Sequence, residues 1–206
     1  MATLVIDPGI ERQLLERRRA SRGDRWDEVW DGVYVMAPLP NLEHQELVIN
    51  LGAAFKSSFA DQPAVRVFPG INVSDRQEGW EQSYRCPDVA VILPGSRAVD
   101  CGAFCFGGPD FVVEITSDYD RSREKFDFYA GVGVREFLIV DRDPWQLELY
   151  TLQGQKLSLA GRVVAGESSS LASQVMPLTF RLVPPSKSGR PQIEIVRTTD
   201  AQRWLA

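Results

Sequence analysis

The spacing of apolar residues predicts one long amphipathic helix in the first half of the chain. Between residues 42 and 59 the apolar positions recur every three or four residues, which is the helical period. These positions are Val48, Leu51, Phe55 and Phe59. Asn41 is a suitable N-cap for this helix. His44 lies at the N-terminal end of the same apolar stripe, so we expect its side chain to point inward.

Shorter apolar runs predict strands. Residues 26–30 and 33–37 flank Asp31-Gly32, a dipeptide that favours a tight turn, so they predict an N-terminal β-hairpin. Residues 65–73 alternate well enough for another strand. Three strongly apolar runs follow, and we expect each to be a core strand: 87–93, 111–116 and 136–141. Residues 98–109 contain three glycines and predict an irregular loop.

Two further helices are expected. Residues 10–20 are rich in Arg, Glu and Leu and predict a short exposed helix. Its end carries the most basic stretch of the chain: Arg17, Arg18 and Arg19, with Arg22 and Arg25 nearby. A solvated helix face is the default interpretation of this stretch, and a phosphate-contacting patch is the alternative. Residues 121–131 predict the other helix, capped by Ser117, Asp118 or Asp120 and ended by glycine.

After Pro144 the pattern becomes β-rich. Residues 147–159 predict a hairpin, and residues 175–183 and 192–196 predict strands joined by an exposed linker. The order of elements predicts an α+β (mixed α/β) fold: a central mixed sheet flanked by helices, with an N-terminal β-hairpin and a β-rich C-terminal tail. We expect one domain over residues 1–206, made of a helical segment (1–25), a core (26–141) and a β-rich extension (142–206).

The composition limits the kinds of molecule that the protein is expected to bind. The 206 residues are 44% hydrophobic and carry a net charge of -5, which counts mildly against a broadly basic nucleic-acid binder but leaves room for a local basic groove. The three cysteines form no disulfide framework, and with a single histidine they do not supply a zinc site, so we expect reduced thiols. We see no signal peptide and no run of about 20 apolar residues, and therefore expect a cytoplasmic protein without membrane contact.

An acid inside an apolar run is the main chemical signal. Glu114 interrupts the strand predicted at 111–116, and a carboxylate there is costly to bury unless it is paired or bound. Asp88 begins the preceding apolar strand. If the two strands are adjacent, both acids can share one face, where they repel unless a cation or proton lies between them. Their hard oxygen donors favour Mg²⁺ or Mn²⁺, with the C=O of Ile115 as a further ligand.

Such a metal acts on phosphate, because it polarises a phosphodiester and lowers the pKa of a bound water. Lys125, on the following helix, would hold the attacking water or offset charge on the phosphate. Tyr129 lies one turn later on the same helix face, where it could contact the phosphate or pack on Lys125.

These residues form a pattern that resembles known nucleases. Pro87-Asp88, Glu114 and a following lysine resemble the PD-(D/E)xK nuclease superfamily. Its lysine usually comes two residues after the acid, where this chain has Thr116, and Lys125 fits the known variant in which the lysine moves onto the next helix. The chain resembles the Uma2 family (DUF820), a restriction-endonuclease-like group, more closely still. That resemblance lies in six segments: 31–38, His44, 87–91, 113–117, 125–129 and 133–141.

The resemblance covers about residues 26–141 and extends toward residue 183. It implies a restriction-endonuclease-like core, DNA as the partner, and a role for His44 at the metal-bound water or the scissile phosphate. It also makes a homodimer plausible, since cutting two strands favours one.

Each residue also has a purely structural interpretation. Asp88 could be a strand-start residue hydrogen-bonded to the turn, and Glu114 could form a buried ion pair with Lys125 or Arg121. Lys125 alone is more often a solvated helix lysine, and His44 alone a satisfied core histidine. The joint pattern favours a functional role for Asp88, Glu114 and Lys125 and leaves both interpretations open for His44.

The sequence therefore predicts a Mg²⁺- or Mn²⁺-dependent endonuclease that hydrolyses DNA phosphodiesters. Asp88 and Glu114, with the C=O of Ile115, bind the metal. Lys125 assists the water, and His44 and Tyr129 are accessory. The alternative is a catalytically inactive nuclease-fold module that binds nucleic acid or protein, which the net charge and Thr116 favour. A third interpretation is an oligomeric structural protein that binds no nucleic acid.

Overall fold

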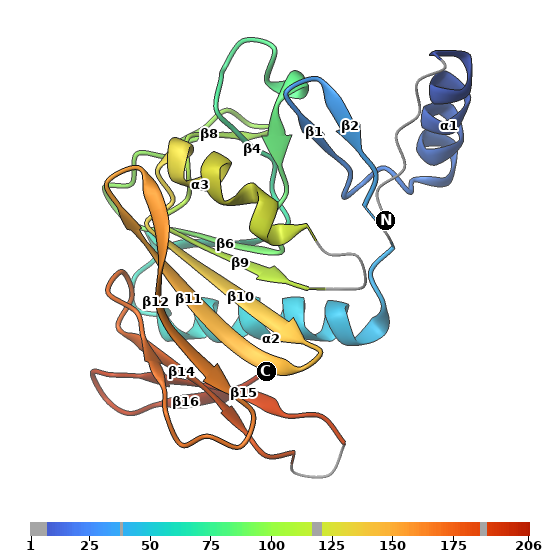
Figure 1. Cartoon of the computed structure of the whole chain (residues 1–206). Coiled ribbons are helices and arrows are strands. Elements are labelled where there is room, and N and C mark those ends of the chain that lie inside the picture. The colour runs from blue at the N-terminus through green and yellow to red at the C-terminus, as the bar shows by residue number, and fades with distance from the viewer. Residues whose placement is uncertain (1–7, 38, 117–120, 186–188) are drawn as a thin grey trace.

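In the part of the chain that the structure describes, the protein has three sheets and three α-helices. Figure 1 shows their arrangement in the computed structural model. The structure describes residues 8–37, 39–116, 121–185 and 189–206. The α-helices are α1 (Pro8–Ser21), α2 (Leu42–Ser58) and α3 (Phe126–Val132). None of the helices in this part of the chain combines the length and the apolarity that a membrane crossing requires.

The central sheet has six strands in the order β12-β11-β10-β9-β6-β3. Their bounds are β3 Arg66–Pro69, β6 Val89–Ile92, β9 Phe111–Ile115, β10 Glu136–Arg142, β11 Trp145–Gln153 and β12 Lys156–Val164. β9 and β10 are parallel, because the chain passes through α3 between them, and the other neighbours are antiparallel. The central mixed sheet flanked by helices is therefore confirmed.

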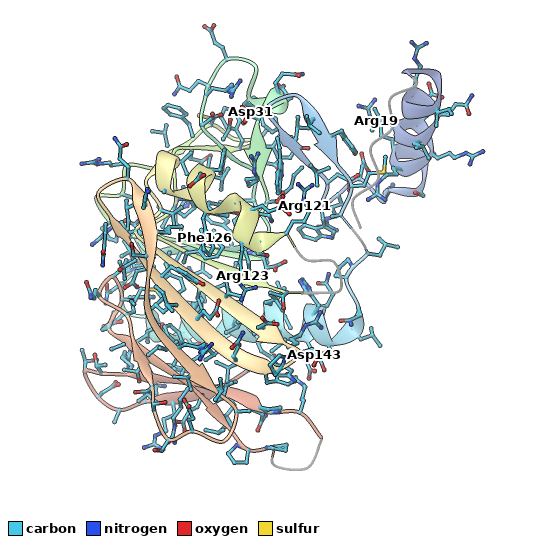
Figure 2. The ribbon with its side chains drawn as sticks, viewed as in Figure 1. Arg19, Asp31, Arg121, Arg123, Phe126 and Asp143 are labelled. Carbon is cyan, nitrogen blue, oxygen red and sulfur yellow. The ribbon has the colours of Figure 1, made fainter. Side chains whose placement is uncertain are left out.

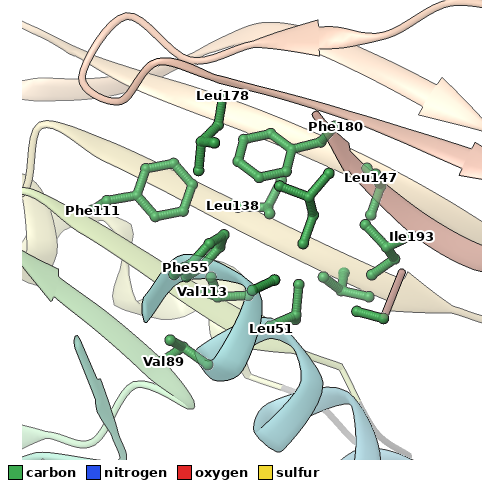
Figure 3. Close-up of a cluster of buried hydrophobic side chains, with 14 of the residues drawn as sticks. Leu51, Phe55, Val89, Phe111, Val113, Leu138, Leu147, Leu178, Phe180 and Ile193 are labelled. Atoms are coloured by element: carbon green, nitrogen blue, oxygen red, sulfur yellow. The ribbon is translucent and has the colours of Figure 1, made fainter. Parts of the chain in front are cut away.

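The larger core lies on the face of this sheet that contacts α2 (Figure 3). Phe55 of α2, Phe111 of β9 and Phe180 of the C-terminal sheet pack with ring centroids 5.8–6.1 Å apart. Leu51 and Leu138 are fully buried beside them. The apolar stripe predicted on α2 is thus the face that covers the sheet. Asn41 caps this helix by accepting a hydrogen bond from the N–H of His44 (2.9 Å).

The opposite face of the central sheet is covered by α3. Since side chains alternate along a strand, Val112 of β9 and Ala90 of β6 point to this side, while Val113 points to α2. The same period places Glu114 and Asp88 on the α3 side. The core on this face is small, and polar side chains lie at its edge near the N-terminal hairpin.

The second sheet has the order β2-β1-β5-β4-β8-β7 and contains the predicted hairpin. Its strands are β1 Glu28–Trp30, β2 Val33–Val35, β4 Val73–Ser74, β5 Tyr84–Arg85, β7 Val99–Asp100 and β8 Cys105–Phe106. The turn between β1 and β2 is Asp31-Gly32, with φ of 49° and 83°. Positive φ at both positions is the type I′ geometry that matches the twist of a hairpin.

The third sheet, β13-β14-β15-β16, is formed by the C-terminal part of the chain and packs under α2 (Figure 1). Its strands are β13 Leu171–Ala172, β14 Leu178–Val183, β15 Gln192–Arg197 and β16 Arg203–Leu205. The hairpin expected within 147–159 is the longer pair β11 and β12, which extends the central sheet.

Three elements differ from the prediction. The strand expected over 65–73 is two strands in different sheets, because Gly70 (φ +60°) turns the chain between β3 and β4. The loop expected over 98–109 contains β7 and β8. The helix expected over 121–131 begins as a 3₁₀ turn at Ser122–Lys125 before α3, which ends at Gly133 with φ +87°. The caps expected at Ser117, Asp118 or Asp120 lie outside the described residues.

The arginines at the end of α1 have different surroundings. Arg18 pairs with Asp27 and donates to the carbonyl of Ala37 (2.9 Å), so it anchors α1 to the hairpin. Arg17 and Arg19 are exposed. Figure 2 shows Arg19 on α1, the helix that stands apart from the sheets.

Candidate active site

The pairing of β6 with β9 brings the two predicted acids together. Val89 pairs with Val113 in this antiparallel ladder, so one step further Asp88 lies opposite Glu114. The carboxylate of Asp88 accepts a hydrogen bond from the N–H of Ile115 at 2.7 Å. The two strands are therefore adjacent, which is the condition under which the sequence placed both acids on one face, and the acids share one side of the sheet.

Glu114 is buried, with 4% of its surface exposed, and its carboxylate is held from several directions. The ammonium of Lys125 lies 2.9 Å from Oε1 and 3.1 Å from Oε2 of Glu114. The hydroxyl of Tyr129 donates to Oε1 at 2.9 Å. Lys125 thus reaches back to the acid from the 3₁₀ turn, and the buried ion pair named as the structural interpretation of Glu114 is present.

Glu28 is a member of this cluster that the sequence analysis missed. Its Oε1 accepts hydrogen bonds from the ammonium of Lys125 and from the N–H of Cys86, both at 2.8 Å. The indole N–H of Trp30 donates to Oε2 at 2.6 Å. The available signal was an acid at an inward position of the predicted hairpin. It is weak, because hairpin strands are usually exposed on one face.

His44, in the first turn of α2, contacts Asp88 of the cluster. Its Nε2 lies 3.2 Å from Oδ1 of Asp88, and its side chain is buried as the apolar stripe predicted. Within the described residues its Nδ1 is buried without a hydrogen-bond partner. Tyr129 is fully buried in the α3 core, so its ring supports Glu114 and is not at the surface of the site.

Burial is the largest influence on the pKa values of Glu114 and Lys125. It raises the pKa of the Glu114 carboxyl above its usual range; the charge of Lys125 opposes this shift, and the negative charges of Asp88 and Glu28 add to it. Burial alone would lower the pKa of Lys125, but the charges of Glu114 and Glu28 outweigh that effect and raise it. The ammonium is therefore held in its charged form beside an excess of acidic groups.

These side chains line a pocket of about 160 Å³ between the hairpin, the start of α2 and the ends of β6 and β9. Its charged lining consists of Glu28, Asp88 and Glu114 against Arg121 and Lys125. Trp26 and Trp30 form an aromatic wall, and the guanidinium of Arg121 lies 4.3 Å from the ring centre of Trp30. Figure 2 shows Arg121 where the start of α3 approaches the hairpin.

The donors in this pocket suit a hydrated divalent cation. Within the residues that the structure describes, no three His, Cys, Asp or Glu side chains converge closely enough to hold a metal ion. Asp88, Glu114 and Ile115 nevertheless line the pocket together, and Mg²⁺ and Mn²⁺ prefer carboxylate and carbonyl oxygens. Mg²⁺ usually keeps several waters and takes only one or two protein carboxylates. The residues present therefore fit such an ion by their chemistry.

The mixed α+β fold, with paired acids and a lysine at one end of its central sheet, belongs to a nuclease-like fold class. The sequence profile of the Uma2 family, described as "Putative restriction endonuclease", matches residues 12–183. The chain belongs to the Uma2 family.

A solved structure supports the fold. It is a crystal structure from Anabaena variabilis described as a "putative nuclease belonging to DUF820". The TM-score is 0.54 at 16% sequence identity, over 71% of this chain and 80% of that chain. No curated protein matches the chain. Family membership supports a nuclease function in general, with nucleic acid as substrate, and families of this kind generally use divalent metals.

Proposed function

We propose that the protein is a Mg²⁺- or Mn²⁺-dependent endonuclease that hydrolyses phosphodiester bonds in DNA. The observation that carries this proposal is the convergence of Glu114, Asp88 and the ammonium of Lys125 at one pocket. Two acids can hold a divalent metal and the lysine can offset charge on the phosphate, so these groups are suited to metal-assisted phosphodiester hydrolysis.

The metal ligands and the lysine have different roles in this proposal. Asp88, Glu114 and the C=O of Ile115 would hold the metal, which when bound polarises the phosphate and lowers the pKa of a bound water. The ammonium of Lys125 is directed at the same place and offsets negative charge on the phosphate or orients the attacking water.

The other members of the cluster act through these groups. Glu28 and Tyr129 position Lys125 and Glu114 through hydrogen bonds of 2.8 and 2.9 Å. His44 contacts Asp88 at 3.2 Å and is near enough to hold a water or a phosphate oxygen at the pocket. A homodimer would place two such sites on the two strands of a duplex.

Calorimetric titration of Mn²⁺ tests the metal site. We expect the wild type to bind Mn²⁺, and Glu114→Gln to bind at least about 10- to 100-fold more weakly, the loss seen even when an indirect metal partner is removed. Glu194→Gln is the matched control, because Glu194 is a similarly buried acid paired with Arg181 in the C-terminal sheet. Equal Mn²⁺ binding by wild type and Glu114→Gln would remove the metal site.

A second candidate is a nuclease-fold module that binds nucleic acid without cutting it. The closed ion pair of Lys125 with Glu114 and Glu28 favours it, since the ammonium already neutralises part of the acid cluster. A plasmid-nicking assay with Mn²⁺ separates the two candidates. Nicking by the wild type that is lost in Glu114→Gln supports the enzyme, whereas DNA binding without nicking supports the module.

A further inference from the structure

A second pocket, of about 260 Å³, lies directly beside the acid cluster. Trp26 and Cys86 belong to the walls of both pockets, so the two cavities are separated by single side chains. The second pocket extends from the hairpin to the edge strand β3 and the loop that carries β7 and β8. Nothing in the proposed chemistry uses it.

Three aromatic rings line this pocket, and two of them are held in place by a neighbouring residue. Trp26 lies against Gly70, where an added Cβ would be only 2.0 Å from the nearest ring carbon. Phe104 is stacked on Trp80 with centroids 4.7 Å apart and planes 12° apart. Phe68 is half-buried on β3. The pocket therefore contains aromatic rings whose positions are largely set before a planar ligand binds.

An arginine guanidinium lies over two of these rings. Arg25 lies 5.2 Å from the ring centre of Trp26, and Arg66 lies 4.7 Å from that of Phe68. Asp100 pairs with Arg66 at 2.7 Å, so the charged lining amounts to two cations against one acid. This balance is the reverse of the acid cluster next door, where three carboxylates face two cations. The second pocket thus favours an anionic ligand, and the first a cationic one.

We propose that this second pocket binds one unpaired base of the DNA strand, next to the phosphodiester held at the acid cluster. Aromatic faces with nearby arginines are the usual surface for a nucleobase and its phosphates. A cavity of about 260 Å³ is below the ~300–1,000 Å³ of typical ligand sites and suits a single base. Single-stranded DNA presents such a base directly, and in a duplex a base can be flipped out of the stack, as enzymes that modify bases do. The position beside the reacting bond rests on the proposed function, whereas the base-binding property does not.

The test compares two single-stranded oligonucleotides of equal length in metal-free buffer: one of thymidines and one with abasic units on the same phosphate backbone. We expect the wild type to bind the thymidine strand about tenfold or more tightly than the abasic strand, as stacking on an aromatic side chain requires. Trp26→Leu and Phe68→Leu should lose most of this preference and bind the abasic strand as the wild type does. Trp26→Phe, which keeps a stacking face, should retain it.

Arginine variants separate base binding from charge. Arg25→Met should weaken the binding of both strands. Arg162→Met should change neither, because Arg162 is exposed on β12, at the opposite edge of the central sheet from β3. If the wild type binds neither strand or does not distinguish them, or if Trp26→Leu and Phe68→Leu keep the full preference, the base pocket is excluded.

Nicking of a plasmid with Mn²⁺, measured separately, reports on the proposed function alone. Nicking by a protein that shows no base preference would refute the pocket and leave the nuclease. A base preference in a protein that does not nick would support the base pocket and refute the proposed nuclease activity.

Discussion

The carboxylate of Glu28 accepts a hydrogen bond from the ammonium of Lys125 at 2.8 Å, across 97 positions of the chain. Lys125 lies on a 3₁₀ turn, and among the described residues Glu114 is the other acid that its ammonium contacts. The second carboxylate determines where along the pocket the ammonium rests. Glu28 is itself fixed by the N–H of Cys86 and the indole of Trp30, so the hairpin sets the geometry of the site.

Glu28→Gln should therefore slow Mn²⁺-dependent nicking while leaving the protein folded. The amide still accepts from Lys125, but the weaker attraction lets the ammonium shift, and a misplacement of about 1 Å costs on the order of 10²-fold in rate. Single-turnover nicking checks this, with binding of uncleaved DNA measured in Ca²⁺. Binding should be unchanged. A rate equal to that of Glu194→Gln would show that Glu28 plays no part in positioning.

Lys125→Met should destabilise the fold strongly, and in a pH-dependent way. The variant leaves Glu28 and Glu114 buried without their cation, which costs about 3–5 kcal/mol. Burial already raises the pKa of Glu114, and losing Lys125 raises it further. A carboxyl whose pKa is higher in the folded than in the unfolded state stabilises the folded state at pH values below its unfolded pKa of about 4.3. This contribution to stability is lost as the pH rises above that value. The difference from wild type should thus be largest at neutral pH and shrink toward pH ~4.3.

Urea unfolding across this pH range measures the effect, and Lys156→Met is the control for removing a lysine charge. Lys156 is exposed at the start of β12, so its loss should change stability by less than about 0.5 kcal/mol. A destabilisation by Lys125→Met that is independent of pH would mean that lost packing, rather than unpaired acid, is the cause.

Gly70→Ala should disturb Trp26. The left-handed conformation (φ +60°) costs a residue with a Cβ roughly 1–2 kcal/mol, and the added carbon also meets the indole ring. Gly79→Ala isolates the first effect, because Gly79 has φ +64° and nothing within 4 Å of an added Cβ. Thermal unfolding and tryptophan fluorescence should show a larger change for Gly70→Ala. Equal effects of the two variants would argue that Trp26 is free to move away.

Phe180→Ala should show that the C-terminal sheet is part of the main core. Phe180 is fully buried and packs against Phe55 and Phe111, so truncation should cost about 3–5 kcal/mol. Leu159→Ala, on an exposed leucine of β12, should cost far less. Unfolding by urea measures both. A small loss for Phe180→Ala would mean that the sheet is only loosely attached.

The parts of the fold that the sequence predicted have strong local signals. The apolar runs of β6, β9 and β10, the Asp31-Gly32 turn and the stripe on α2 each depend on neighbouring residues. The place of Glu114 was accessible for the same reason, because an acid in an apolar strand is conspicuous. Elements whose existence depends on distant pairing, such as β8 beside β4, had no such signal.

The site was harder to predict than the strands. Glu28 joins the cluster because the hairpin lies beside β5. Alternation puts Glu28 on the same face as Trp26 and Trp30, but it does not indicate that this face lies at the site. The reach of Lys125 depends on a 3₁₀ turn that the helical pattern concealed. His44 was placed inward correctly, but its contact with Asp88 arises from the packing of α2 on the sheet, which a one-dimensional pattern does not contain.

Thr116 stands where the nuclease superfamily that this chain resembles usually carries its lysine. Here the hydroxyl of Thr116 donates to Asp141 at 3.0 Å, and its carbonyl accepts from Arg142 at 2.7 Å, so the residue fastens the end of β9 to β10. The positive charge beside Glu114 comes instead from the 3₁₀ turn Ser122–Lys125, and Arg123 of this turn contacts the same Asp141 at 3.3 Å. Asp141 therefore connects the end of β9 to the turn that carries Lys125, so a change at this one acid would affect both.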